Sequence, residues 1–552
     1  MAQQTVSVQH PAIGTVSGIR RLPQVDQFLG IQYATLADRF SRATLIEAYP
    51  NSIDGTALGP LPVADPAGCD NEQLLLQHAL PHPTYTFSDT ECLTLNVAAP
   101  SEQSATPLPV LVFVHGGGFV TGSANWPQWD VAAIVEKSIE AKSPIVAVSI
   151  NYRLGHFGFL TSAALRDAGY LPNNGLYDQK VAFRWIQKFI HGFGGDPNNV
   201  TYLGNSIGAA SGFIHLQSGE RLFKRLAALG GSPLIRPFPT EVAEFAYGMV
   251  TKALGLESLS PAEQVRALLE MPAADLEAKL RNVPAPVCSV VDGDVIRGVT
   301  TYDVLSKPQE VDRLFPGIGS VKDVLLGSCQ FDGMIFAATA LPGRKDDLAA
   351  TLEQSLRAAL KSDADSLVPS ILSLYGLDKA SVMDTKTKTL AVTGFLHDIC
   401  FGQGARATAQ AWADARDRHG TTTRLMHFDA PNPWPGAYAG YATHALEVAF
   451  ALQNYNAHLA PGQRACAERL GRDLIAFASG RGPFPPFGGE NGGVEMVYTA
   501  GVAAETDGST LLAAAEAGGK GRRAKLVEIV GGKPEMLDKL SDAFGLFLRG
   551  PQ

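Results

Sequence analysis

Ser206 has the residue type and the neighbours that nucleophilic catalysis requires. It stands in YLGNSIG at 202–208, where Gly204 and Gly208 complete a G-x-S-x-G frame. A β-rich run, VTYLGN, precedes the serine, and residues at helical spacing follow it in SIGAASGFIHLQSG. A serine at a strand-to-helix junction between two glycines is typical of a nucleophile elbow, which exposes the hydroxyl for covalent catalysis. The pattern therefore predicts acyl transfer through Ser206.

An attacking serine needs hydrogen-bond donors for the oxyanion that forms during the reaction. The segment FVHGGGFVTG at 113–122 follows a run of apolar residues and supplies a triple glycine. We expect the N–H groups of Gly117 and Gly118 to bind the oxyanion, together with the N–H of Ile207 at the start of the helix after the serine. His115 is interpreted as a residue that braces this loop rather than as a base.

The base is expected to be a histidine that follows the serine, with an acidic residue between the two in the chain. His444 is preferred because GYATHALEVAF places it in a loop that enters an apolar helix. Asp332 is preferred as the acid because it follows the apolar run KDVLLGS at 322–328, and active groups gather at the carboxyl ends of strands. Asp323 and Asp398 are weaker alternatives. The alternatives for the base are His215, His397, His419, His427 and His458.

These residues require a sheet that brings distant segments together. The continuous apolar runs LPVLVFV (108–114) and PIVAVSINY (144–152) predict strands covered on both faces, and 175–193 predicts an amphipathic helix. Alternation of such segments predicts an α/β fold with a mostly parallel central sheet and helices on both faces. We expect one domain over residues 1–552, with helical cap insertions around 235–315 and 340–420.

Composition excludes several other classes of function. The 552 residues are 45% hydrophobic and 18% charged, and the formal net charge of -9 argues against nucleic-acid binding. The longest apolar runs are strand-sized, which predicts no membrane span. The first residues lack a signal-peptide pattern, so a cytoplasmic protein is expected. The six cysteines are widely spaced and predict no metal site, and nothing indicates an organic cofactor.

Several longer motifs resemble the type-B carboxylesterase/lipase family, which includes the cholinesterases and fungal carboxylesterases. QFLGIQYATLADRF, ECLTLNV, HGGGFVTGS, INYRLGHFGFL and the stretch NNGLYDQ…FGGDPNNVTYLGNSIGAASG follow in the family's order. The closing KLSDAFGLFLRGP is similar to the tail of intracellular fungal members. The resemblance implies an α/β-hydrolase fold and a triad of Ser206, Asp332 and His444. It also implies an early disulfide, which would join Cys69 and Cys92.

The sequence departs from this family at four positions near the chemistry. The family's elbow is normally G-E-S-A-G, whereas this chain has Asn205 and Ile207 around the serine. Asp332 stands in the place of the commoner glutamate, and Ala445 replaces the glycine after the histidine. Loss of the elbow glutamate removes a negative charge, so selection for a choline-like cation is not expected.

The function expected from these observations is a serine carboxylesterase that hydrolyses uncharged carboxylic esters or lactones. An alternative on the same scaffold is an acyl-transfer or cyclising enzyme of natural-product biosynthesis, and a third is an inactive adhesion module. The expected partner is a small-molecule ester or lactone, and the chain is expected to be a monomer or a homodimer. Plausible wall residues of the pocket are Phe119, Trp126, Phe336, Trp434 and Phe450.

Overall fold

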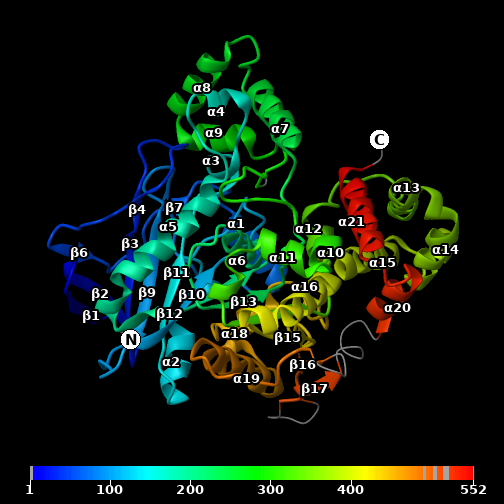
Figure 1. Ribbon diagram of the computed structural model, residues 1–552. Helices are drawn as coiled ribbons and strands as arrows, with labels where there is room; N and C mark the ends of the chain where they lie inside the picture. The colour runs from blue at the N-terminus through cyan, green and yellow to red at the C-terminus, as the bar shows by residue number, and fades with distance from the viewer. Residues whose placement is uncertain (1–3, 288, 489–492, 502–506, 514–520, 551–552) are drawn as a thin grey trace.

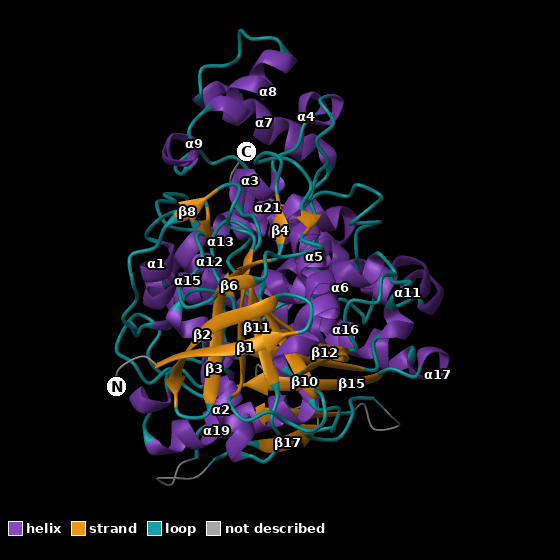
Figure 2. Ribbon diagram, turned by 90° about the vertical axis from the view of Figure 1, so that its left-hand side faces the viewer, coloured by secondary structure: helices purple, strands orange, loops and turns teal. Residues whose placement is uncertain are grey.

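The structure is a computed structural model that describes residues 4–287, 289–488, 493–501, 507–513 and 521–550. A large twisted sheet runs through the centre, with helices on both sides (Figures 1 and 2). Over the described residues the order of its main strands is β1-β2-β3-β9-β11-β10-β12-β13-β14-β15-β16-β17. The predicted α/β fold is confirmed.

The strands of the parallel part lead to the residues singled out by the sequence. All neighbours from β11 to β16 pair in parallel, whereas β1, β2, β3 and β9 form an antiparallel edge and β17 pairs antiparallel with β16. The parallel strands are β11 (Val146–Ile150), β10 (Leu108–Val114), β12 (Gly195–Asn205), β13 (Arg225–Leu229), β14 (Asp323–Cys329), β15 (Thr422–Phe428) and β16 (Val494–Tyr498). The antiparallel strands are β1 (Gln4–His10), β2 (Gly14–Leu22), β3 (Val25–Gln32), β9 (Thr94–Pro100) and β17 (Thr510–Ala513).

The continuous apolar runs are strands because both faces of the sheet are covered. Val112 and Val114 of β10 belong to one hydrophobic core cluster, whereas Leu111 and Phe113 belong to another. One face contacts α2 (Ala132–Glu140) and α19 (Pro461–Ala478). The other face contacts α5 (Asn174–Phe189), α6 (Ile207–Gln217) and α16 (Gln403–Asp414). The predicted helix at 175–193 corresponds to α5 and the 3-10 turn η2 (Ile190–Phe193).

Two groups of helices extend beyond these layers. The first contains α7 (Thr240–Ala253), α8 (Pro261–Glu270) and α9 (Ala273–Leu280), at the top of Figure 1 with α3 (Gly155–Phe159) and α4 (Ala163–Asp167). The second contains α12 (Met334–Thr339), α13 (Leu348–Leu360), α14 (Ala364–Leu374) and α15 (Thr385–His397). The C-terminal helices α20 (Arg522–Ile529) and α21 (Pro534–Arg549) pack on α14 and α13, so the second group also includes the end of the chain.

Candidate active site

Ser206 lies at a strained turn between β12 and α6. Its φ of 55° and ψ of -122° are unusual for a residue with a side chain, and such strain clusters at functional sites. The flanking glycines are required by close packing: a Cβ on Gly204 would lie 2.5 Å from the Gly208 carbonyl oxygen. A Cβ on Gly208 would lie 2.4 Å from the carbonyl oxygen of Val114. The G-x-S-x-G frame is therefore the set of residues that this turn can accommodate.

His444 and Asp332 are joined by a short hydrogen bond. The Nδ1–H of His444 donates to Oδ1 of Asp332 at 2.7 Å, and the other carboxylate oxygen accepts from the backbone N–H of Cys329 at 2.8 Å. Asp332 is fully buried and His444 is nearly so. Ala445 has a φ of 68°, a left-handed conformation that glycine adopts more easily than alanine. This explains why the carboxylesterase family named above has glycine at this position. The structure thus places Ser206 and His444 on one cavity, with Asp332 behind the imidazole.

The surroundings of His444 favour its protonated form. Burial by itself lowers the pKa of the imidazole and is the largest single influence, whereas the hydrogen bond and the charge of Asp332 raise that pKa. Glu447 and Glu72 act in the same direction, so the pKa lies above its ordinary value. Glu447 is buried and accepts a hydrogen bond from the Cys329 thiol at 2.7 Å. Burial and the nearby Asp332 raise the pKa of Glu447, so this second carboxyl resists ionisation beside the first.

The triple-glycine loop borders the same cavity as Ser206. Gly117 has a φ of 92°, and a Cβ there would lie 2.0 Å from the Thr121 carbonyl oxygen. Gly118 has a φ of 62°, and Ile207 is the first residue of α6, whose free N–H groups face the serine end. All three line the cavity with Ser206. This arrangement brings the expected oxyanion donors to one place.

His115 braces the loop, as the sequence predicts. Its ring stacks on Tyr152 with centroids 4.5 Å apart, and its Nδ1–H donates to the Gly116 carbonyl at 3.0 Å. Burial lowers the pKa of His115 to about 4, so the imidazole is neutral near pH 7.

The alternative bases are occupied elsewhere or lie behind the acid. His397 is buried, and its Nδ1 is 3.9 Å from Oδ2 of Asp332, on the side of the carboxylate away from the 2.7 Å bond to His444. Burial lowers the pKa of His397 to about 4. The other four contact residues outside the cavity lining: His215 with Gln179, His419 with Asp312, His427 with Ser328, and His458 with His78.

The alternative acids are also held by other partners. Asp323 begins β14, at the opposite end of the strand from Asp332, and pairs with Arg424 at 3.0 Å. Asp398 accepts hydrogen bonds from Tyr375 at 2.8 Å and from Arg522 at 2.6 Å. Neither is hydrogen-bonded to His444, whose carboxylate partner is Asp332.

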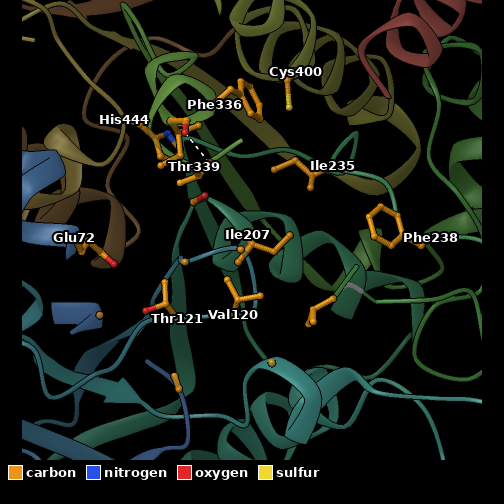
Figure 3. Close-up of a pocket in the computed structure, with 18 of the residues that line it drawn as sticks. Glu72, Val120, Thr121, Ile207, Ile235, Phe238, Phe336, Thr339, Cys400 and His444 are labelled. Atoms are coloured by element: carbon orange, nitrogen blue, oxygen red, sulfur yellow. Dashed lines mark hydrogen bonds between the residues drawn. The ribbon is translucent and has the colours of Figure 1, made fainter. Parts of the chain in front are cut away.

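The cavity above Ser206 has a volume of about 1060 Å³ and is lined mainly by apolar side chains. Figure 3 shows Val120, Ile207, Ile235, Phe238 and Phe336 around it. Walls come from the glycine loop, from α6, α9, α12 and α21, and from the π-helical turn η6 (Asp398–Gly402). Of the five wall residues proposed from sequence, Phe336 lines this cavity, whereas Phe119, Trp126, Trp434 and Phe450 are buried in the core.

Sequence reasoning missed the charged residues that line the cavity, among them Asp65, Glu72 and Arg236. Glu72 belongs to α1 (Gly68–Leu76), and its Oε1 accepts a hydrogen bond from the Trp129 indole N–H at 2.9 Å. Burial raises the pKa of Glu72 to about 7. The sequence around it, GCDNEQLLL, contains no motif that marks one polar residue as facing a site.

The disulfide implied by the family resemblance is not formed. Cys69 and Cys92 are both free thiols, and they lie in different hydrophobic core clusters. Cys69 on α1 approaches Gln73 and Gln128. Burial raises the pKa of each thiol to about 12, so both are held in the neutral, unreactive form.

The fold and the elbow define this chain as a protein of the α/β-hydrolase class. It belongs to the carboxylesterase family, whose sequence model matches residues 2–480. A solved structure described as a thermophilic PNB esterase superposes with a TM-score of 0.70 at 22% identity, over 94% of this chain and 99% of that one. That likeness supports the fold.

Several curated proteins are similar in sequence. Bovine (Bos taurus) thyroglobulin is 34% identical over 57% of this chain and 11% of its own length. Fumonisin B1 esterase of Sphingopyxis macrogoltabida is 31% identical over 60% of this chain and 57% of its own length. Para-nitrobenzyl esterase of Bacillus subtilis (strain 168) is 27% identical over 82% of this chain and 84% of its own length. The matched region thus spans about a tenth of the first relative and little more than half of the second.

Proposed function

We propose that this chain is a serine carboxylesterase that hydrolyses uncharged carboxylic esters or lactones. The observation that carries the proposal is the convergence on one cavity of a strained serine, a carboxylate-bound histidine and the glycine loop. The esterase names of two of the three relatives support the same reaction class.

In this proposal Ser206 Oγ attacks the ester carbonyl carbon, and its proton passes to Nε2 of His444. Asp332 holds the imidazole with Nδ1 protonated and stabilises the cation that forms. The N–H groups of Gly117, Gly118 and Ile207 bind the oxyanion of the tetrahedral intermediate. The intermediate collapses, the bond to the alcohol oxygen breaks, and His444 returns the proton to that oxygen. Water then attacks the acyl-enzyme by the same route and releases the acid.

The assignment of the nucleophile is tested by covalent labelling with an organophosphate. Ser206→Ala should abolish labelling, because the variant lacks the attacking oxygen. Ser211→Ala is the matched control: Ser211 is buried in the same helix, and its hydroxyl donates to the Ile207 carbonyl at 2.8 Å. That variant should label like the parent chain. Labelling that survives Ser206→Ala would remove the elbow assignment.

The preference for uncharged esters rests on the electrostatics of the pocket. Position 205 carries a neutral asparagine, and burial holds the pKa of Glu72 near 7, which limits its charge at neutral pH. Kinetics on a choline ester and a neutral ester of the same acid test this. A higher kcat/KM for the choline ester would contradict the proposal.

We further propose that the protein acts in the cytoplasm and is related to the intracellular fungal members of the family. The tail KLSDAFGLFLRGP and the unbonded Cys69 and Cys92 support this, since reduced thiols are typical of that compartment. Among the described helices, none combines the length and apolarity that crossing a membrane requires. Fractionation of the native host, with detection by antibody, tests the location, and recovery in the culture medium would contradict it.

A further inference from the structure

One corner of the cavity, whose lining is mainly apolar, carries polar groups with unused hydrogen-bonding capacity. Glu72 contributes a carboxylate, and in the described part of the chain its recorded hydrogen bond is the one from the Trp129 indole to Oε1. The second oxygen, Oε2, is therefore available to a donor in the cavity. Figure 3 shows Glu72 and Thr121 on one side of the cavity, with Ile235 and Phe238 on the other.

The Thr121 hydroxyl packs against the face of α1 that carries Glu72. A Cβ on Gly68 would be 2.6 Å from Thr121 Oγ1, and Gly68 precedes Glu72 by one helical turn. This hydroxyl is buried and has no hydrogen-bond partner among the described residues. The backbone N–H of Thr121 donates to the Gly117 carbonyl at 3.1 Å, which fixes the residue next to the glycine loop.

Asn205 continues this polar wall to the nucleophile. The residue is 2% exposed, it lines the cavity, and its Nδ2 has no partner among the described residues. A Cβ on Gly116 would be 2.9 Å from Asn205 Oδ1, so Asn205 and Thr121 lie against successive glycines of one loop. An amide N–H donor, a hydroxyl and a carboxylate thus follow one another from Ser206 to α1.

This wall lies on the side where the alcohol leaves. His444 must donate a proton to the leaving alcohol oxygen, so that part of the ester is next to the imidazole. The end of α1 is joined to the loop that leads to His444, because Asn432 Nδ2 donates to the Leu76 carbonyl at 3.1 Å and the Tyr438 N–H donates to Gln77 Oε1 at 2.7 Å. Glu72 and His444 both line the cavity, so α1 lies on the same side.

Resting on the carboxylesterase function proposed above, we propose that Glu72, Thr121 and Asn205 form a subsite for a hydroxyl group on the alcohol part of the ester. The substrate class is then esters of diols and other polyols. A hydroxyl satisfies this corner because it donates to the carboxylate and accepts from the amide or the threonine hydroxyl. An alkyl group would leave the buried polar atoms of this corner without hydrogen-bond partners, and unpaired buried polar atoms weaken binding strongly. An ammonium group would face the Asn205 N–H donor, and so fits less well.

The test compares three butyrate esters: propyl butyrate and 2-hydroxyethyl butyrate, which match in size, and the larger, protonated 2-(dimethylamino)ethyl butyrate. The parent chain should show kcat/KM about tenfold higher for the hydroxyethyl ester than for the propyl ester, the scale expected for one or two well-placed hydrogen bonds. Glu72→Gln should reduce this ratio to about threefold or less. Thr121→Val, which keeps the shape of the side chain, should lower the same ratio.

Asp70→Asn is the matched control, because Asp70 is an exposed carboxylate of the same helix that pairs with His82. It should leave the ratio unchanged. Equal kcat/KM values for the propyl and hydroxyethyl esters in the parent would overturn the subsite but not the esterase proposal. A clear preference for the ammonium ester would also overturn it, in favour of a cation site. Hydrolysis of none of the three esters would overturn the proposed function and the subsite with it.

Discussion

The substitution Asp332→Asn tests the central geometry of the site. Both carboxylate oxygens of Asp332 accept a hydrogen bond, one from His444 Nδ1 at 2.7 Å and one from the Cys329 backbone N–H at 2.8 Å. In the asparagine variant, the Cys329 N–H can be satisfied only by the amide oxygen. The amide NH2 must then face His444, whose Nδ1 becomes an acceptor. The imidazole proton moves to Nε2, and this nitrogen can no longer take the proton of Ser206.

The expected loss in kcat is about 10⁴-fold, the scale seen when a triad acid is replaced by its amide, which corresponds to about 5.4 kcal/mol in the activation free energy. Unfolding is not the expected cause. Asp332 is one of the groups that raise the pKa of the buried Glu447. Removal of the Asp332 charge therefore lowers that pKa and lets Glu447 ionise in its place.

The assay is hydrolysis of p-nitrophenyl butyrate at pH 8, with circular dichroism and thermal unfolding of each variant. Asp323→Asn is the control: Asp323 begins β14, whereas Asp332 follows the far end of that strand, and the control should keep activity within about twofold. Glu447 lies near enough to act as a substitute acid, since a Cβ on Gly230 would be 3.1 Å from its Oε1 and 3.2 Å from His444 Nδ1. The double variant Asp332→Asn/Glu447→Gln removes that route. If it keeps more than about one per cent of the parent kcat, the assignment of Asp332 as the orienting acid is wrong.

Two further changes probe the electrostatics and the packing of the site. Glu447→Gln should lower the pKa of His444, because the charge of Glu447 helps to raise that pKa above its ordinary value of 6.5. The acid limb of the kcat/KM profile should therefore move to lower pH. An unchanged acid limb would show that Glu447 does not act on the imidazole. Gly208→Ala places a Cβ 2.4 Å from a backbone carbonyl oxygen. It should lower the free energy of unfolding by about 1–3 kcal/mol, measured by urea denaturation, and should reduce kcat as the elbow shifts. A variant as stable and active as the parent would contradict the packing argument.

Local patterns were enough to predict the sheet and the strand-to-helix turn that carries Ser206. Strands β10 and β11 are read from continuous apolar runs, and Ser206 from a strand, a glycine frame and a helix within one short segment. His444 and Asp332 depend on contacts across more than a hundred residues. These two residues were predicted from their positions beside expected strands and helices and from the family resemblance. No periodic pattern in a sequence shows which histidine contacts which carboxylate.

Residues that act through tertiary placement could not be predicted in this way. Glu72 is one carboxylate in a short helix, and only the docking of α1 over the cavity makes it part of the site. The C-terminal helix α21 was not expected in the cap, yet Phe544 on that helix lines the cavity and packs against Phe336. An amphipathic helix shows in sequence which face it buries, but not what it buries that face against.

The neutral elbow and the acidic α1 have a joint consequence for substrate choice. With asparagine at 205 in place of the glutamate usual in the family, the residue beside Ser206 carries no charge. Glu72, one of several carboxylates that line the cavity, belongs to α1, and burial keeps its pKa near neutrality. A permanent cation would therefore gain little at the serine, and Glu72 beyond it would be only partly ionised near pH 7. A neutral group that can donate and accept hydrogen bonds fits both positions, so the change at Asn205 and the presence of Glu72 favour the same class of ester.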